Sequence, residues 1–159
     1  MPAVQISVDD PAAPDVRTLL ERHLEFAALH SRPEDVHALD VERLLEPHVT
    51  FFTYRADGQL LGVGAIKQLD AGHAELKSMH VAESARGRGI GRAILEHLLQ
   101  VARDRGVRRV SLETGSMAAF ASARSLYQRA GFSPCAPFAD YSPSRNSTFM
   151  TLQLDPAVP

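Results

Sequence analysis

The stretch Ala85-Arg86-Gly87-Arg88-Gly89-Ile90-Gly91-Arg92 lies between a run of strand-like residues and a run with helical spacing. Its three glycines alternate with larger residues, and glycine lets the backbone approach a ligand closely. A helix start presents unpaired N–H groups and a partial positive charge, to which Arg86, Arg88 and Arg92 add fixed charge. The stretch predicts a loop that binds phosphate or pyrophosphate. A basic turn that only caps the helix is the structural alternative.

Two other phosphate-binding loops fit less well. A Walker loop needs Gly-Lys followed by Ser or Thr, and this chain has no such dipeptide. A dinucleotide fingerprint is closer, because Glu113 lies about 20 residues further on, where a ribose-binding acid is expected. Its glycines, however, should run Gly-x-Gly-x-x-Gly, whereas here they alternate. A nucleotide-binding oxidoreductase is therefore the second hypothesis.

Outward from the loop, hydrophobic periodicity predicts a mixed α/β fold in one domain spanning residues 1–159. The segment from 73 to 112 reads as strand, helix and parallel strand, and the hairpins on either side of it read as antiparallel. Strands are expected at 4–8, 49–54, 60–69, 73–81, 107–112, 132–135 and 148–154, and helices at 15–28, 36–45, 90–106 and 119–130.

The strand at 73–81 has an irregular apolar phase. Ala74 and Leu76 share one parity, and Met79 and Val81 share the other. This change predicts a β-bulge near Lys77 and Ser78, which would bend the strand and leave backbone groups available to a ligand.

Two motifs together resemble the GCN5-related N-acetyltransferase (GNAT) superfamily. Residues 86–91 match its Arg/Gln-x-x-Gly-x-Gly/Ala signature, and residues 123–132, Ala-Arg-Ser-Leu-Tyr-Gln-Arg-Ala-Gly-Phe, resemble its second hallmark. The resemblance extends from about Val4 to Leu154. The segments 111–116, 137–141 and 146–150 are similar to a bacterial subgroup of N-acetyltransferases.

The resemblance implies a strongly twisted mixed sheet with helices on both faces and acetyl-CoA (coenzyme A) as cofactor. It also implies that backbone groups of Met79, His80 and Val81 pair with the pantetheine arm. The pyrophosphate would be wrapped by the N–H groups of Arg86, Gly87, Arg88, Gly89, Ile90, Gly91 and Arg92. Homodimers are common in this family.

Direct acetyl transfer requires a neutral amine, yet a lysine-type amine has a pKa of about 10.4. A carboxylate, acting directly or through water, is the usual base. Glu75 is the first candidate, with pairing to Lys77 as its structural alternative, and Glu113 is the second. Tyr127 is implied to point at the acetyl-CoA sulfur, where it can protonate the leaving thiolate. The alternative for Tyr127 is a packed aromatic ring.

The acceptor is expected to be a small-molecule primary amine or an amino acid. Asp140, Tyr141 and Arg145 lie in a Pro-bounded segment that can bind an ammonium or a carboxylate, although a surface turn explains the same residues. The helices between 15 and 45 are implied to form the rest of the pocket. A catalytically silent acyl-CoA sensor is the third functional hypothesis.

Composition narrows the partners. Seventeen basic and nineteen acidic residues give a net charge of -2, which disfavours nucleic acid. No apolar run reaches the roughly 20 residues that span a bilayer. The single cysteine, Cys135, and the absence of a secretory pattern favour the cytoplasm. The seven histidines show no metal-ligand spacing, so no metal is expected.

Overall fold

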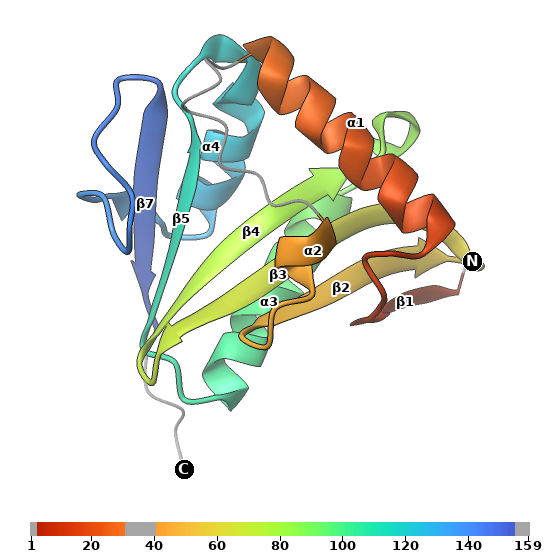
Figure 1. Ribbon diagram of the computed structural model, residues 1–159, viewed down its shortest axis with the longest axis horizontal. Helices are drawn as coiled ribbons and strands as arrows, with labels where there is room; N and C mark the ends of the chain where they lie inside the picture. The colour runs from red at the N-terminus through yellow and green to blue at the C-terminus, as the bar shows by residue number, and fades with distance from the viewer. Residues whose placement is uncertain (1–2, 31–40, 155–159) are drawn as a thin grey trace.

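The computed structural model describes residues 3–30 and 41–154 and contains a seven-stranded mixed sheet in the order β1-β2-β3-β4-β5-β7-β6 (Figure 1). The strands are β1 (Val4–Val8), β2 (Val49–Ala56), β3 (Gln59–Asp70), β4 (His73–Val81), β5 (Arg109–Gly115), β6 (Ser133–Pro134) and β7 (Ser147–Gln153). The helices are α1 (Pro14–His30), α2 (Val41–Leu44), α3 (Ile90–Asp104) and α4 (Ala121–Arg129), with short 3-10 turns η2 (Glu83–Ala85) and η3 (Ala118–Phe120).

This architecture confirms the predicted fold class, including the parallel β4–β5 pair within otherwise antiparallel pairings. The closing strand expected at 132–135 is only two residues long. The first part of the helix expected at 36–45, including Val36 and Leu39, lies outside the described residues. Helix α2, Val41–Leu44, corresponds to its last part.

Two apolar clusters fill the two faces of the sheet. On one face α3 packs through Ile90, Ile94 and Leu98, and on the other α1 packs through Val16 and Leu20. Helix α3 approaches β3 very closely. A Cβ atom at Gly64 would lie 2.7 Å from Ile94 Cγ2, so a glycine is needed there. No helix in residues 3–30 and 41–154 is long and apolar enough to cross a membrane.

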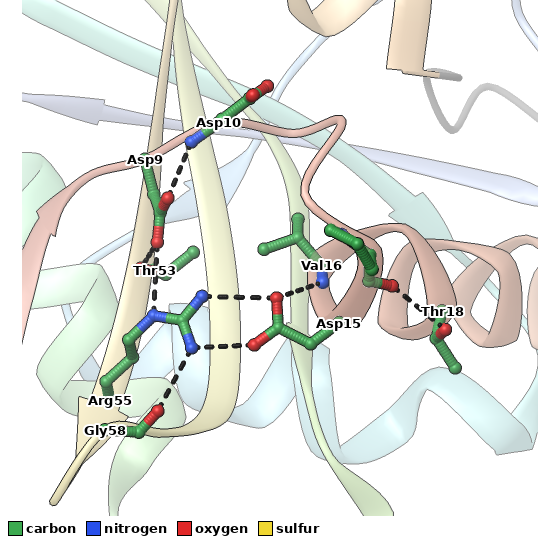
Figure 2. A network of polar contacts seen from close by, with 9 residues as sticks. Asp9, Asp10, Asp15, Val16, Thr18, Thr53, Arg55 and Gly58 are labelled. Carbon is green, nitrogen blue, oxygen red and sulfur yellow. Dashed lines mark hydrogen bonds and ion pairs between the residues drawn. The ribbon is translucent and has the colours of Figure 1, made fainter.

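A polar network fixes the start of α1 to the sheet (Figure 2). The Arg55 guanidinium on β2 donates to Asp9 Oδ2 at 3.2 Å and to Asp15 Oδ2 at 2.7 Å. The Thr53 hydroxyl also donates to Asp9, at 2.7 Å. The network therefore joins β2, the β1–α1 connection and the first turn of α1.

We expect Arg55→Ala to lower the melting temperature by roughly 2–4 °C, because partly exposed ion pairs contribute about 1 kcal/mol together. Differential scanning fluorimetry checks this result. Arg92→Ala is the matched control, since its ion pair with Glu96 is 77% and 64% exposed and should contribute almost nothing. Equal melting temperatures for both variants would contradict a stabilising role for the Arg55 network.

Candidate active site

The glycine loop leads directly into α3. Gly87 and Gly89 adopt positive φ angles of 80° and 79°, and Gly89 is the N-cap residue of α3. Positive φ is strained for residues with a side chain, so these positions favour glycine. The loop therefore presents backbone N–H groups at the positive end of a 15-residue helix.

The three loop arginines take different directions. The Arg86 guanidinium lies over the Phe26 ring of α1 at 5.9 Å, and Arg92 pairs with Glu96 one turn further along α3. Arg88 donates to the Ser84 carbonyl at 3.4 Å and does not line the cleft described below, whereas Arg86 and Arg92 do.

The β-bulge predicted near Lys77 and Ser78 is present one residue further on. Val63 pairs with His80 and Ala65 with Lys77, so Ser78 and Met79 both stand opposite Gly64. Strand β4 pairs with β5 only from His73 to Glu75, and the two strands then diverge (Figure 1). The β4 edge at Met79, His80 and Val81 consequently has no β5 partner in the described sheet.

A cleft of about 1220 Å³ lies where strands β4 and β5 diverge. It runs from the glycine loop and α3, past the bulged part of β4, to α4 and the end of β5. Among the predicted site residues, it is lined by Glu75, Met79, His80, Val81, Arg86, Gly87, Gly89, Ile90, Gly91, Arg92, Glu113, Tyr127 and Tyr141. One cavity thus joins the glycine loop to the candidate catalytic groups.

Tyr127 lies in this cleft on α4. Arg124, one turn earlier, donates to the carbonyls of Gly115 and Met117 at 2.7 and 2.8 Å, which ties α4 to the end of β5. The Tyr127 hydroxyl points to Met79 Sδ at 3.7 Å. Burial, together with the negative charge of Glu113, raises the pKa of Tyr127 to about 12. Tyr127 is therefore a phenol that stays protonated through neutral pH.

Glu75 belongs to a buried triad with Lys77 and Tyr141. Lys77 Nζ lies 3.1 Å from Glu75 Oε2 and 2.6 Å from the Tyr141 hydroxyl, which in turn donates to Glu75 Oε2 at 2.5 Å. The side chains of Glu75 and Lys77 are only 3% and 9% exposed. Burial and the charge of Glu75 raise the pKa of Tyr141, so its hydroxyl remains a donor. The ion pair considered as the alternative for Glu75 is present.

Glu113 lies on β5, beyond the last residue that pairs with β4. It is less buried than Glu75, and its negative charge contributes to the raised pKa values of both Tyr127 and Tyr141. Its carboxylate is thus within electrostatic reach of both phenols, on the wall of the cleft that faces β4.

Helix α1 contributes groups that sequence reasoning did not single out. His23 and Phe26 line the cleft, and the His23 ring lies 4.8 Å from that of His80. Burial lowers the pKa of His23 to about 4. Burial, the positive charge that His23 carries once it is protonated, and the charge of Arg86 lower the pKa of His80 to about 3. Both imidazoles are therefore neutral at physiological pH. For His23 and Phe26, the sequence offered only the general expectation that helices between 15 and 45 form part of the pocket.

The structure separates the three candidate acceptor-binding residues of the Pro-bounded segment. Tyr141 reaches the cleft, whereas Asp140 and Arg145 are exposed and are not among the residues that line it. The side chains that the structure describes include no cluster of three or more His, Cys, Asp or Glu residues suited to a metal ion.

Comparisons with known proteins agree on the class. The sequence model of the acetyltransferase (GNAT) family matches residues 14–132. An uncharacterized N-acetyltransferase of Bacillus subtilis, YsnE, is 44% identical, covering 95% of this chain and 100% of the relative. The IAA acetyltransferase of Azospirillum brasilense is 36% identical, covering 94% and 97%.

Solved structures share the fold. One from Klebsiella pneumoniae, assigned as an acyl-CoA N-acyltransferase, has a TM-score of 0.77 and 29% identity, covering 96% of this chain and 98% of the other. A GNAT acetyltransferase from Elizabethkingia anophelis, solved with acetyl-CoA bound, has a TM-score of 0.69 and 17% identity, covering 95% and 98%. The fold and the relatives define the class of N-acetyltransferases. The chain belongs to the GNAT family.

Proposed function

We propose that this protein transfers the acetyl group of acetyl-CoA directly to the primary amine of a small molecule or amino acid. The observation that carries the proposal is the single cleft that joins the glycine loop to Tyr127 and Glu113. A loop for a pyrophosphate at one end and proton-transfer groups at the other is the arrangement that this reaction requires.

In this proposal the cofactor follows the divergent edge of β4. The pyrophosphate lies at the N–H groups of the loop and the first turn of α3, with Arg86 and Arg92 nearby. The pantetheine arm pairs with backbone groups of Met79, His80 and Val81, which β5 does not engage. This places the thioester at the bulge, close to the Tyr127 hydroxyl.

The chemistry needs proton transfer at both ends of the reaction: the acceptor nitrogen loses two protons, and the leaving sulfur gains one. Glu113, directly or through water, takes a proton from the acceptor ammonium, and the resulting amine attacks the thioester carbonyl. The tetrahedral intermediate collapses with cleavage of the C–S bond, and Tyr127 gives its proton to the departing thiolate. The attacking nitrogen loses its second proton as the amide forms, and this proton restores the Tyr127 phenol. We favour Glu113 over Glu75 as base, because Glu113 is the less buried of these two carboxylates, which both line the cleft, whereas the Glu75 side chain is 3% exposed and ion-paired with Lys77.

The acceptor enters from the side of α1. His23 and Phe26 of α1 line the cleft on this side, and neutral His80 of β4 and Tyr141 line it as well. The aromatic lining favours an amine with an apolar or aromatic body over a highly charged one. A second candidate is an acceptor that resembles the one used by the IAA acetyltransferase of Azospirillum brasilense. Its support is the 36% identity of that relative over 94% of this chain.

Calorimetric titration with acetyl-CoA, and separately with NADH, tests the cofactor. Acetyl-CoA binding without an NADH response supports the proposal, and the reverse supports the oxidoreductase hypothesis. Thiol release from acetyl-CoA is then measured with a panel of L-amino acids and primary alkyl and aryl amines, and each product is confirmed by its mass. Binding without turnover on any amine would favour a silent sensor.

We expect Gly89→Ala to raise the KM for acetyl-CoA about 5- to 10-fold. A Cβ at Gly89 meets nothing within 4 Å, but at φ +79° it strains the loop by about 1 kcal/mol and shifts its N–H groups. Gly106→Ala is the matched control: its φ is +75°, it has equal free space, and it lies at the other end of α3. Unchanged cofactor kinetics in Gly89→Ala, or equal changes in both variants, would remove the loop from the binding site.

A further inference from the structure

Ser78 combines two energetically costly features at the bulge of strand β4. Its φ angle is +55°, in the left-handed region that residues with a side chain avoid, and it is one of the two bulge residues opposite Gly64. Such a backbone costs about 1–2 kcal/mol. Asp57, another residue at positive φ, occupies a hairpin turn beside Gly58, where this conformation is ordinary.

The Ser78 side chain is also unsatisfied. The residue is 7% exposed, and its Oγ makes no hydrogen bond to any part of the chain that the structure describes. A buried hydroxyl without a partner costs about 1–3 kcal/mol. Backbone strain and an orphaned hydroxyl at one residue are typical of a functional position.

The location of Ser78 indicates which function this is. It lines the cleft at the point where β4 leaves β5, between Lys77 of the buried triad and Met79, which the Tyr127 hydroxyl contacts. Oγ is buried, and no hydrogen bond from the described residues holds the hydroxyl in its rotamer. A role in the cleft requires rotation about the Cα–Cβ bond to turn the hydroxyl toward it.

We propose that Ser78 is a further catalytic residue, whose hydroxyl donates a hydrogen bond to the thioester oxygen as that oxygen becomes negatively charged. The role rests on the proposed function, because it requires a thioester at the bulge. The hydroxyl keeps its proton throughout: the amine nitrogen forms the new bond to the carbonyl carbon, the C–S bond breaks, and Ser78 stabilises only the intermediate. The contact strengthens with charge, so it acts on turnover more than on binding.

The test compares two serines whose buried hydroxyls both lack a hydrogen-bond partner among the described residues. Ser147 on β7 is 8% exposed and its Oγ also lacks a partner among the described residues, but it does not line the cleft. We expect Ser78→Ala to lower kcat 10- to 100-fold, with both KM values within about 3-fold and no fall in melting temperature. Ser147→Ala should leave kcat unchanged. Wild type and variants are assayed with acetyl-CoA and the best amine of the panel above.

Ser78→Gly separates the hydroxyl from the backbone, because glycine accepts a φ of +55° without strain. It should lose as much kcat as Ser78→Ala. Recovery of kcat in the glycine variant, an unchanged kcat in Ser78→Ala, or an effect confined to the acceptor KM would each overturn the role while leaving the proposed function intact. A wild-type protein that acetylates no amine would overturn the proposed function, and this role with it.

Discussion

Tyr127→Phe is expected to lower kcat about 100-fold or more while leaving the Kd for acetyl-CoA within about 2-fold, since positioned acid catalysis contributes roughly 10²- to 10⁴-fold. The variant removes only the hydroxyl, whose contact is the weak one to Met79 Sδ at 3.7 Å. The ring packs edge-on against Phe132 and is retained, so the fold should be unaffected. Steady-state kinetics and calorimetry on the same preparation measure both quantities.

The pH profile checks the acid role of Tyr127 independently. Its pKa is raised to about 12, mainly by burial, so the phenol is still protonated at pH 10. We therefore expect no loss of kcat from Tyr127 ionisation between pH 8 and 10, where an ordinary tyrosine would begin to titrate. A kcat in Tyr127→Phe equal to that of the wild type would exclude the acid role.

Glu113→Gln is expected to lower kcat/KM for the acceptor about 100-fold or more at pH 7, because the amide cannot take a proton from the ammonium. The loss should shrink as pH rises toward the pKa of the amine, where the acceptor is already neutral. A kcat/KM profile against pH measures both effects. The melting temperature should fall less than in Glu75→Gln, because Glu113 is only half-buried, whereas the Glu75 side chain is 3% exposed.

Glu75→Gln provides the contrasting variant. It leaves the Lys77 ammonium buried without its carboxylate, and breaking such a pair costs about 3–5 kcal/mol, or roughly 10 °C in melting temperature. Replacing Glu75 should therefore change mainly the melting temperature, whereas replacing Glu113 should change mainly kcat/KM for the acceptor. If Glu75→Gln instead kept its melting temperature and abolished the pH-dependent step, Glu75 would be the base and our assignment of Glu113 would be wrong.

Local sequence patterns determined the order of elements and the position of the glycine loop. The alternation of glycines at 87, 89 and 91 specifies a conformation that few other residues adopt, and two of these glycines have positive φ. The change of apolar phase between Leu76 and Met79 likewise predicted the bulge to within one residue. Such features depend on neighbours in the chain, so they can be read without a tertiary structure.

Only the tertiary structure decided how distant residues meet in the cleft. Tyr141 reaches Glu75 from 66 positions away in the chain, and His23 reaches His80 from another element altogether. No local sequence pattern predicts either contact. The same holds for the Ser78 hydroxyl, because its lack of a partner within residues 3–30 and 41–154 depends on every element packed around it. The sequence by itself determined the fold and the position of the glycine loop, because both follow from local backbone geometry and periodicity. Packing between elements decided that Glu75 is ion-paired with Lys77, that the pKa of Tyr127 is raised, and that the Ser78 hydroxyl has no partner among the described residues.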